Sequence, residues 1–370
     1  MSEIKKIKKS YDHVLVGYNL SSLTYAYRLH QKGESYCIID SSYVSIQHMK
    51  TLPSLENPVY SRVPFTGVNE EQKPSTTLDD LLGKKQILEG TPLTFDKGAF
   101  KSFLGFGDTK INEIDAISGY CATQNLQFDE QPEQIWQTFA NTVEEHVFLD
   151  QEVTGIDFSE SEITQLTLNG KSSLSGKQFV FFSYFPFLFE TIGSQAKSMA
   201  SKVAKVSWWS SVSLIVHHIE EPETFELNQV YLLKGSKEQP CVGLFSRING
   251  ELISRWESFL PTELTPDSET TGTILKEIKK QIKRAFHGSS DKKSLEHILV
   301  HKSTYADFSK SSVESGKVGK FSNLQVCSPL FSGFTGWYSE ALAGWELPIA
   351  QKDQENTLDS SIKVAAPSAP

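Results

Sequence analysis

The first forty residues carry apolar and polar positions in an order typical of a strand–helix–strand unit. Residues 13–16 form a short apolar run, as strands do in a parallel sheet whose two faces are covered. Gly17 follows this run, and residues 20–29 then place apolar side chains at helical spacing. A second apolar run, 36–39, ends at Asp40. The pattern predicts two parallel strands joined by a helix.

The remaining pattern predicts a mixed α/β chain. Residues 132–146 fit a helix with Pro132 in its first turn, and the closing residues 338–350 fit another. Proline and polar residues predict loops at "SLENPVYSRVPFTG" and "NEEQKPSTTLDD", residues 54–67 and 69–80. Turn residues between short apolar segments predict a β-meander with strands 147–149, 154–158, 163–168 and 179–182. Further antiparallel strands are predicted at "VSWWSSVSLIVHHI", "VYLLK", "CVGLFSRI" and "ELISRWESFL". An amphipathic helix is predicted at 269–287.

Composition narrows the class of protein. The 370 residues, 38% hydrophobic and 22% charged, suit two globular domains. A net charge of −9 argues against nucleic acid as a partner, because phosphate binding needs a basic face. Four cysteines without a CxxC pair, and His217-His218 with its rings on opposite faces of a strand, predict no metal site. No segment resembles a signal peptide or a transmembrane helix, so we expect a cytoplasmic protein.

The turn after the first strand has the layout of a loop that binds a dinucleotide pyrophosphate. Such loops carry three glycines, for the tight turn, for the approach of phosphate, and for helix packing. Gly17, Asn19 and Ser22 stand at these positions, and Leu20 and Ser21 begin the helix. The acid that binds ribose is expected about 20 residues further on, where Asp40 and Ser41 stand. The loop alone leaves three readings open: an FAD site, an NAD site, or a strand–helix–strand unit without a ligand.

Three motifs in chain order resemble the superfamily of FAD-dependent amine oxidases, protoporphyrinogen oxidases and phytoene desaturases. They are "VLVGYNLSSLTYAYRL", "EVTGID" and "NLQVCSPLFSGFTGWYSEALAGWELPIA". The resemblance implies an FAD-binding domain with Rossmann-like topology, built from discontinuous segments, and an α+β substrate-type domain with an antiparallel sheet. It also implies that Val153 contacts the adenine side of FAD, and that Gly336, Trp337 and Tyr338 lie near the flavin ring. The implied limits are 1–60, 131–200 and 318–350 for the first domain, 61–130 and 201–317 for the second, and 351–370 for a disordered tail.

The cofactor-facing motifs depart from the family pattern. After Asp40 the family has an RxGGR stretch, where this chain reads "SSYVSIQHMKT". Ser328 stands near the position of an acid that binds the ribityl chain, and "SSVSLIVHHI" lacks a lysine that several amine oxidases carry. Two functions therefore stay open. The chain is either an FAD-dependent oxidoreductase that transfers hydride from an amine or hydrophobic substrate to flavin, or a non-catalytic homologue with lost or weakened FAD binding that acts as a binding or partner protein. No catalytic residue can be assigned.

Overall fold

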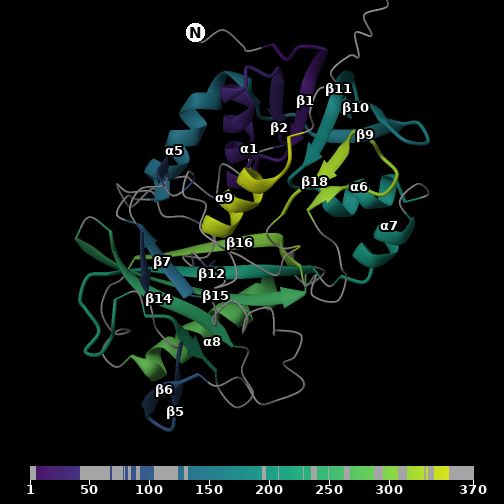
Figure 1. Ribbon diagram of the computed structural model, residues 1–370. Helices are drawn as coiled ribbons and strands as arrows, with labels where there is room; N and C mark the ends of the chain where they lie inside the picture. Colours follow the sequence, from purple (N-terminus) through teal and green to yellow (C-terminus); the bar gives the residue numbers. More distant parts are fainter. Residues whose placement is uncertain are drawn as a thin grey trace, which may run out of the picture.

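The computed structural model shows two large sheets, each covered by helices (Figure 1). The structure describes these residues: 6–41, 67–68, 78, 80–81, 85–88, 92–103, 124–128, 132–193, 197–206, 208–227, 229–234, 240–248, 250–261, 267–286, 295–306, 315–328, 331 and 337–349. Gly336 and the predicted tail lie outside them. Among the described residues, no helix combines the length and the apolar character needed to cross a membrane.

The eight-stranded sheet has a parallel centre. Its strands run in the order β17-β18-β11-β1-β2-β8, and β9 and β10 attach through β11. The bounds are β1 Ser10–Val16, β2 Tyr36–Ile39, β8 Val147–Phe148, β9 Val153–Phe158, β10 Ile163–Leu168, β11 Ser172–Phe181, β17 Gly316–Lys317 and β18 Leu324–Val326. β1 pairs with β2 on one side and β11 on the other, both in parallel. The predicted strand–helix–strand unit, β1-α1-β2, is confirmed, with α1 at Leu20–Gln31.

Alternation along the central strands creates a core on each face of this sheet. Leu15, Ile38 and Val180 face a cluster with α1, α5 (Pro132–Val143) and α9 (Trp337–Glu346). Their neighbours Val14 and Ile39 face the opposite cluster, with β9, β10, α6 (Phe185–Thr191) and α7 (Lys197–Val203). A strand buried on both faces reads as a continuous apolar run, which is why the sequence revealed β1 and β2.

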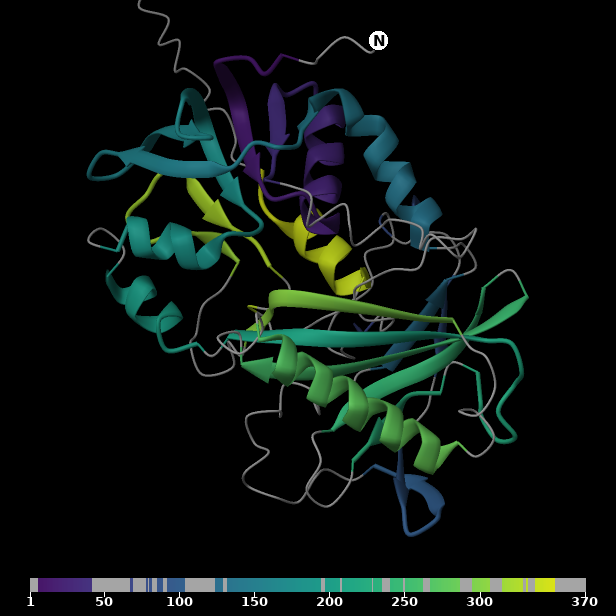
Figure 2. The same ribbon diagram turned by 180° about the vertical axis from the view of Figure 1, so that it is seen from behind.

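The seven-stranded sheet lies below the first and is largely antiparallel. Its order is β16-β12-β15-β14-β13-β5-β6, with bounds β5 Leu93–Asp96, β6 Ala99–Ser102, β12 Trp208–His218, β13 Tyr231–Leu233, β14 Cys241–Ile248, β15 Glu251–Pro261 and β16 Leu295–Ala306. Helix α8 (Ser268–Ala285) covers one face, and its predicted stripe of Ile274, Ile278 and Ile282 is buried there. In Figure 2, α8 lies in front of this sheet, and β16 is the strand nearest the eight-stranded sheet and α9. The domain limits given above stay a prediction.

The sequence analysis did not predict the strands between residues 67 and 128. They are β5, β6 and a three-stranded sheet of β3 (Gly67–Val68), β4 (Lys85–Leu88) and β7 (Gln124–Phe128), and only Gly67 falls within a predicted loop. The expected four-strand meander covers only β9, β10 and β11, because β8 pairs in parallel with β2. β11 also pairs with three strands: its first residues with β10, and its later ones with β1 on one side and β18 on the other.

Candidate functional site

The predicted loop lies where three parallel strands end. β1 ends at Val16, β2 at Ile39 and β11 at Phe181, and the carboxyl ends of parallel strands meet at one edge of a sheet. The edge therefore brings together the turn at Gly17, the acid at Asp40 and the segment that follows β11. The sequence analysis identified the first two and missed the third.

Gly17 makes the tight turn that the motif requires. Its φ of +109° is a backbone conformation that residues with a side chain rarely adopt, and its N–H donates to the Ile39 carbonyl at 2.9 Å. A Cβ at this position would lie 2.4 Å from Ser183 Oγ. The room that this glycine provides is thus used by a residue of the chain itself, from the segment after β11.

Asn19 and Ser22 stand at the second and third glycine positions. The side chain of each accepts a hydrogen bond from the backbone N–H of the other. Asn19 Oδ1 accepts from the Ser22 N–H at 3.0 Å, and Ser22 Oγ accepts from the Asn19 N–H at 3.0 Å. This is a reciprocal capping box at the start of α1. Asn19 Nδ2 also donates to the Phe182 carbonyl at 3.0 Å, which ties the loop to the end of β11. Two amides that would face a phosphate are therefore bonded within the chain.

Asp40 is also bonded within the chain. Its Oδ2 accepts from the Tyr18 N–H at 2.6 Å, and its Oδ1 accepts from the Tyr184 hydroxyl at 2.8 Å. The Ser41 N–H donates to the same Tyr184 oxygen at 3.2 Å, and Ser41 Oγ contacts it as well. Asp40 as a whole is 7% exposed. The Tyr184 hydroxyl thus binds one oxygen of the acid that the sequence analysis predicts to bind ribose.

Tyr184 is held in an unusual backbone conformation. Its φ is +61°, in the left-handed region, where a bulky residue is strained. Burial first, and then the negative charge of Asp40, raise the pKa of Tyr184 to about 12. The hydroxyl is therefore protonated at neutral pH and available to donate to Asp40. The hydrogen bonds to Asp40 and Ser41 offset part of the backbone strain.

The start of α1 is buried against the last helix, α9. Leu20 and Ser21 are both buried, and Ser21 Oγ donates to the Glu340 carbonyl at 2.6 Å. Thr24 Oγ1 donates to the Ala341 carbonyl at 2.9 Å. Trp337 and Tyr338 belong to the first turn of α9, which packs on α1 in both views (Figures 1 and 2). The implied place of these two residues beside a flavin ring stays a prediction.

The remaining predicted site residues are bonded elsewhere. Val153 is buried in the core at the start of β9, where it pairs with Leu168 of β10. Ser328, after β18, donates its N–H to Ser315 Oγ at 3.2 Å, and its carbonyl accepts from the same hydroxyl at 3.3 Å. Neither residue has a hydrogen bond to the loop at Gly17 in the part of the chain that the structure describes. Their predicted contacts with FAD stay untested.

A fit of FAD to this loop can be judged from its hydrogen bonds. A pyrophosphate would need the amides of Tyr18, Asn19 and Ser22, and a ribose would need the carboxylate of Asp40. Each of these groups is bonded to a side chain of the protein itself. In this arrangement the residues do not fit the cofactor. Binding would require the Asn19 and Tyr184 side chains to leave their positions.

A second polar group lies on the seven-stranded sheet, on the face opposite α8. Ser213 pairs with Glu257, and Ser211 and Arg255 lie on the same face by alternation. All four are buried. Within the described residues, no hydrogen-bonding partner reaches Ser211 Oγ or Ser213 Oγ. The sequence analysis noted only that this strand lacks a lysine, yet the serine alternation in "SSVS" is a signal of a polar face on this strand.

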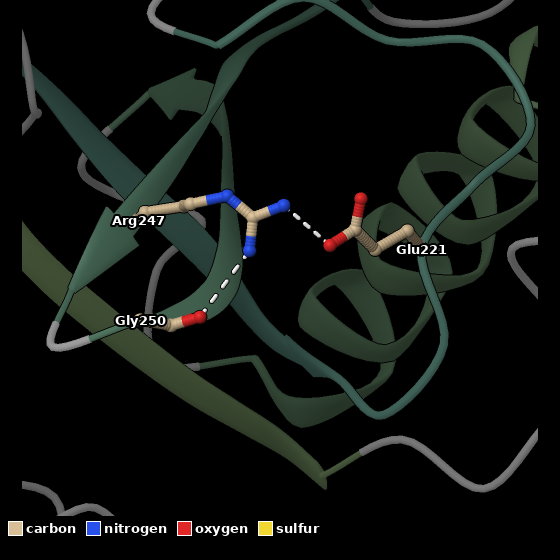
Figure 3. A network of polar contacts seen from close by, with 3 residues as sticks. All are labelled: Glu221, Arg247 and Gly250. Atoms are coloured by element: carbon tan, nitrogen blue, oxygen red, sulfur yellow. Dashed lines mark hydrogen bonds and ion pairs between the residues drawn. The ribbon is translucent and has the colours of Figure 1, made fainter.

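The ion pair of Figure 3 is of a different kind. Arg247, near the end of β14, reaches Glu221 in the loop after β12, and its Nη1 donates to the Gly250 carbonyl at 3.2 Å (Figure 3). Both charged side chains are exposed, so water screens their attraction and the pair contributes about 0–1 kcal/mol. It fastens a loop to the β14–β15 hairpin and belongs to no site.

Comparisons with known proteins agree with the fold. No protein-family model matches the sequence, and no curated protein matches it. Among solved structures, wild-type putrescine oxidase bound to putrescine has a TM-score of 0.57 at 12% identity, over 91% of this chain and 97% of that one. Cyclohexylamine oxidase from Brevibacterium oxydans has a TM-score of 0.58 at 10% identity, over 90% and 97%. Reduced UDP-galactopyranose mutase has 0.59 at 8% identity, over 80% and 84%.

These likenesses bear on the fold alone. The predicted fold class is confirmed: the chain is a mixed α/β protein with two main sheets, and the similar structures are Rossmann-type flavoproteins. The resemblance to amine oxidases is likewise supported at the level of the fold. Identities near 10% carry no residue roles from those enzymes to this chain.

Proposed function

We propose that this chain is a non-catalytic protein of flavoprotein fold, which does not hold FAD and acts by binding a partner protein. The observation that supports this is the closed network at the loop: three amides and one carboxylate bond to Ser22, Asn19, Asp40 and Tyr184. A loop that binds phosphate keeps such amides free for its ligand.

The energetic argument favours exclusion of the cofactor. On binding, phosphate would replace the hydrogen bonds that the backbone amides now make to side chains. The side chains of Asn19, Ser22 and Tyr184 would then lose their partners, and that of Asn19 would have to move. Leaving such polar groups in new, poorer contacts costs about 1 kcal/mol each. A total of about 3 kcal/mol weakens binding by roughly a hundredfold or more. The absence of the arginine- and glycine-rich stretch after Asp40 removes further contacts that the resemblance implies.

An FAD-dependent oxidoreductase is the second candidate. The turn at Gly17 favours it, because it keeps the positive φ of a loop that binds a dinucleotide. Two amine oxidases of similar structure, each matched over 97% of its own length, favour it as well. In this case FAD would accept hydride from an amine or hydrophobic substrate. The chain would supply orientation and a water-poor site between the two sheets.

One titration separates the two candidates. The purified protein is examined for visible flavin absorbance and is then heated with and without FAD at roughly 100 μM, which would stabilise any site of micromolar Kd measurably. We expect a colourless protein and an unchanged Tm. A yellow protein with one flavin per chain, or a clear rise in Tm with FAD, would refute the proposal.

A variant tests the physical reason. The double substitution Asn19→Gly and Tyr184→Phe removes the side chain that caps the loop and the hydroxyl that donates to Asp40. We expect this variant to bind FAD more tightly than the wild type does. Tyr231→Phe is the matched control, because it deletes a tyrosine hydroxyl that accepts from the Glu226 N–H in the other sheet. An equal gain in the control would show that loosening of the fold, and not opening of the loop, admits the cofactor.

A further inference from the structure

We propose that an acidic segment of a partner protein docks on a basic patch at the end of α8. The patch joins exposed cations of α8 to those of the β5–β6 hairpin, and its members are Lys97, Lys101, Lys280, Lys283 and Arg284. Both views place this hairpin beside the end of α8, on the side of the molecule away from the eight-stranded sheet (Figures 1 and 2). The inference rests on the proposed function, because it names the surface and the kind of partner protein.

Aromatic contacts hold the hairpin against the end of α8. The ring centroid of Phe100, in β6, lies 5.2 Å from that of Phe286, the residue that caps α8. It lies 5.1 Å from that of Tyr231, in β13. Phe286 and Tyr231 are both buried in the core under α8. The cations of the helix and of the hairpin therefore keep fixed positions relative to each other.

The charges of the helix and of the hairpin act at one place. Asp96, in the hairpin, accepts a hydrogen bond from Lys101 at 3.0 Å, and this bond is the main cause that lowers the pKa of its carboxyl. The charges of Lys101, Lys97 and Arg284 lower it further. Arg284 belongs to α8, so the helix lies within electrostatic reach of the hairpin. Among the described residues Lys97 forms no ion pair, which leaves its ammonium open to a carboxylate from outside.

The tip of the hairpin carries its lysine against the local preference. Asp96 pairs with Ala99, so Lys97 and Gly98 form a two-residue turn, and both have a positive φ, +51° and +83°. Such turns favour asparagine or aspartate before the glycine, and a bulky residue in this conformation is strained by about 1–2 kcal/mol. Strain of this kind is common at functional sites. The charge at the tip is thus present in spite of the turn, which supports a role in binding.

An effect within the helix explains only part of the patch. Lys283 and Arg284 lie in the last turn of α8, where cations stabilise the negative end of the helix dipole. Lys97 and Lys101 belong to another element, which this dipole does not explain. Cations from two elements therefore gather in a chain whose net charge is −9. A local patch of sign opposite to the whole chain favours a partner of complementary charge.

The chemistry of the patch favours an acidic protein segment over a membrane or a nucleic acid. Helices that bind membranes insert exposed apolar side chains. Here the apolar stripe of α8 is buried, and none of the large exposed hydrophobic side chains among the described residues lies on α8, β5 or β6. Four of the five cations are lysines, whereas arginine is the residue that binds phosphate through two parallel bonds. Glutamate and aspartate carboxylates suit such a group of lysines.

Binding of a labelled oligoglutamate peptide of about ten residues tests the patch. Fluorescence anisotropy with the full-length chain in roughly 0.1 M salt should show binding that weakens as salt is added. Lys97→Glu with Lys283→Glu reverses one charge on each element, and we expect this variant to raise the peptide Kd about tenfold or more. Lys171→Glu with Lys205→Glu is the matched control, because it changes the net charge equally at exposed lysines outside the patch. The control should leave the Kd within about twofold, since salt screens distant charges.

Cross-linking locates the bound peptide. A carbodiimide joins a carboxylate to a lysine amine, and mass spectrometry should find the peptide on Lys97, Lys280 or Lys283. Cross-links spread evenly over other lysines, an absence of binding, or equal Kd values for the patch variant and the control would each overturn the proposal. Circular dichroism checks that both variants are folded.

Two further results bear on the kind of partner and on the proposed function. Tighter binding of single-stranded DNA, or of vesicles rich in phosphatidylserine, through the same lysines would overturn the assignment to an acidic protein segment. The peptide assay is independent of the FAD titration. A protein that binds both FAD and the peptide refutes only the non-catalytic function, whereas a colourless protein that does not bind the peptide refutes only the patch.

Discussion

A single methyl group at Gly344 should separate two helices of the protein. Gly344 lies in α9 where this helix crosses α1, and a Cβ there would lie 1.9 Å from the Ser21 carbonyl oxygen and 2.5 Å from Thr24 Oγ1. Ordinary contacts are near 3.5 Å, so Gly344→Ala requires the helices to part by roughly 1.5 Å. That shift would break the bonds from Ser21 Oγ to Glu340 and from Thr24 Oγ1 to Ala341, now 2.6 and 2.9 Å long.

The magnitude follows from three effects of opposite sign. Overpacking costs about 1–3 kcal/mol, and each broken hydrogen bond costs about 1 kcal/mol. Replacing glycine by alanine inside a helix returns about 1 kcal/mol. We therefore expect Gly344→Ala to lower the free energy of unfolding by about 2–4 kcal/mol, measured by denaturant titration of the full-length chain.

Gly272 provides the matched control. It lies inside α8, and a Cβ there would meet no atom within 4 Å. The same substitution at this position should raise the free energy of unfolding by about 0.5–1 kcal/mol, because only the helix preference changes. Equal effects of the two variants, or a Gly344→Ala protein as stable as the wild type, would refute the close approach of α1 and α9.

Three further predictions concern the loop and the second sheet. Tyr184→Phe should lower the free energy of unfolding by about 1–2 kcal/mol at pH 8, because Asp40 loses its donor. The pKa of Tyr184 in the folded protein is about 12, so the wild type should lose stability as pH rises from 10 toward 12. The variant should lose less over this range when denaturation is measured at each pH. Gly17→Ala should lower the free energy of unfolding by about 2–4 kcal/mol, because of the positive φ and the overlap of the new Cβ with Ser183. Adding Ser183→Gly should recover only the part of this loss that the overlap causes, as measured by the Tm of both variants. Burial lowers the pKa of His218 to about 4, so the wild type should lose about 2–3 kcal/mol as pH falls from 6.5 to 4, and His218→Gln should lose less in the same titration.

The sequence predicted those elements whose residues bury a regular face. β1 and β2 read as continuous apolar runs, and α8 as a stripe of isoleucines, because each meets one uniform environment along its length. α6 was missed, since Pro186 follows its first residue and aromatic residues surround it without a period. The role of β11 could not be predicted either, because one strand pairs with β10 at its start and with β1 at its end.

The candidate site was predicted as far as local spacing reaches. Gly17, Asn19, Ser22 and Asp40 follow from the known layout of one strand–helix–strand unit. Tyr184 lies 144 positions from Asp40 and was missed, although the two are hydrogen-bonded. Only the strand order, with β11 beside β1, brings its segment to the loop. A single sequence gives no signal for such an order.

The two ends of the glycine motif therefore carry different information. Gly17 keeps its positive φ and its bond to Ile39, and its open side is filled by Ser183, so the turn needs glycine whether or not a phosphate is near. Asn19 stands at the position where phosphate would approach and Ser22 at the helix-packing position, and the two form a reciprocal cap. A first glycine thus indicates the fold, while the second position indicates the ligand. By this criterion the loop of this chain is a structural turn, which agrees with the proposed loss of FAD binding.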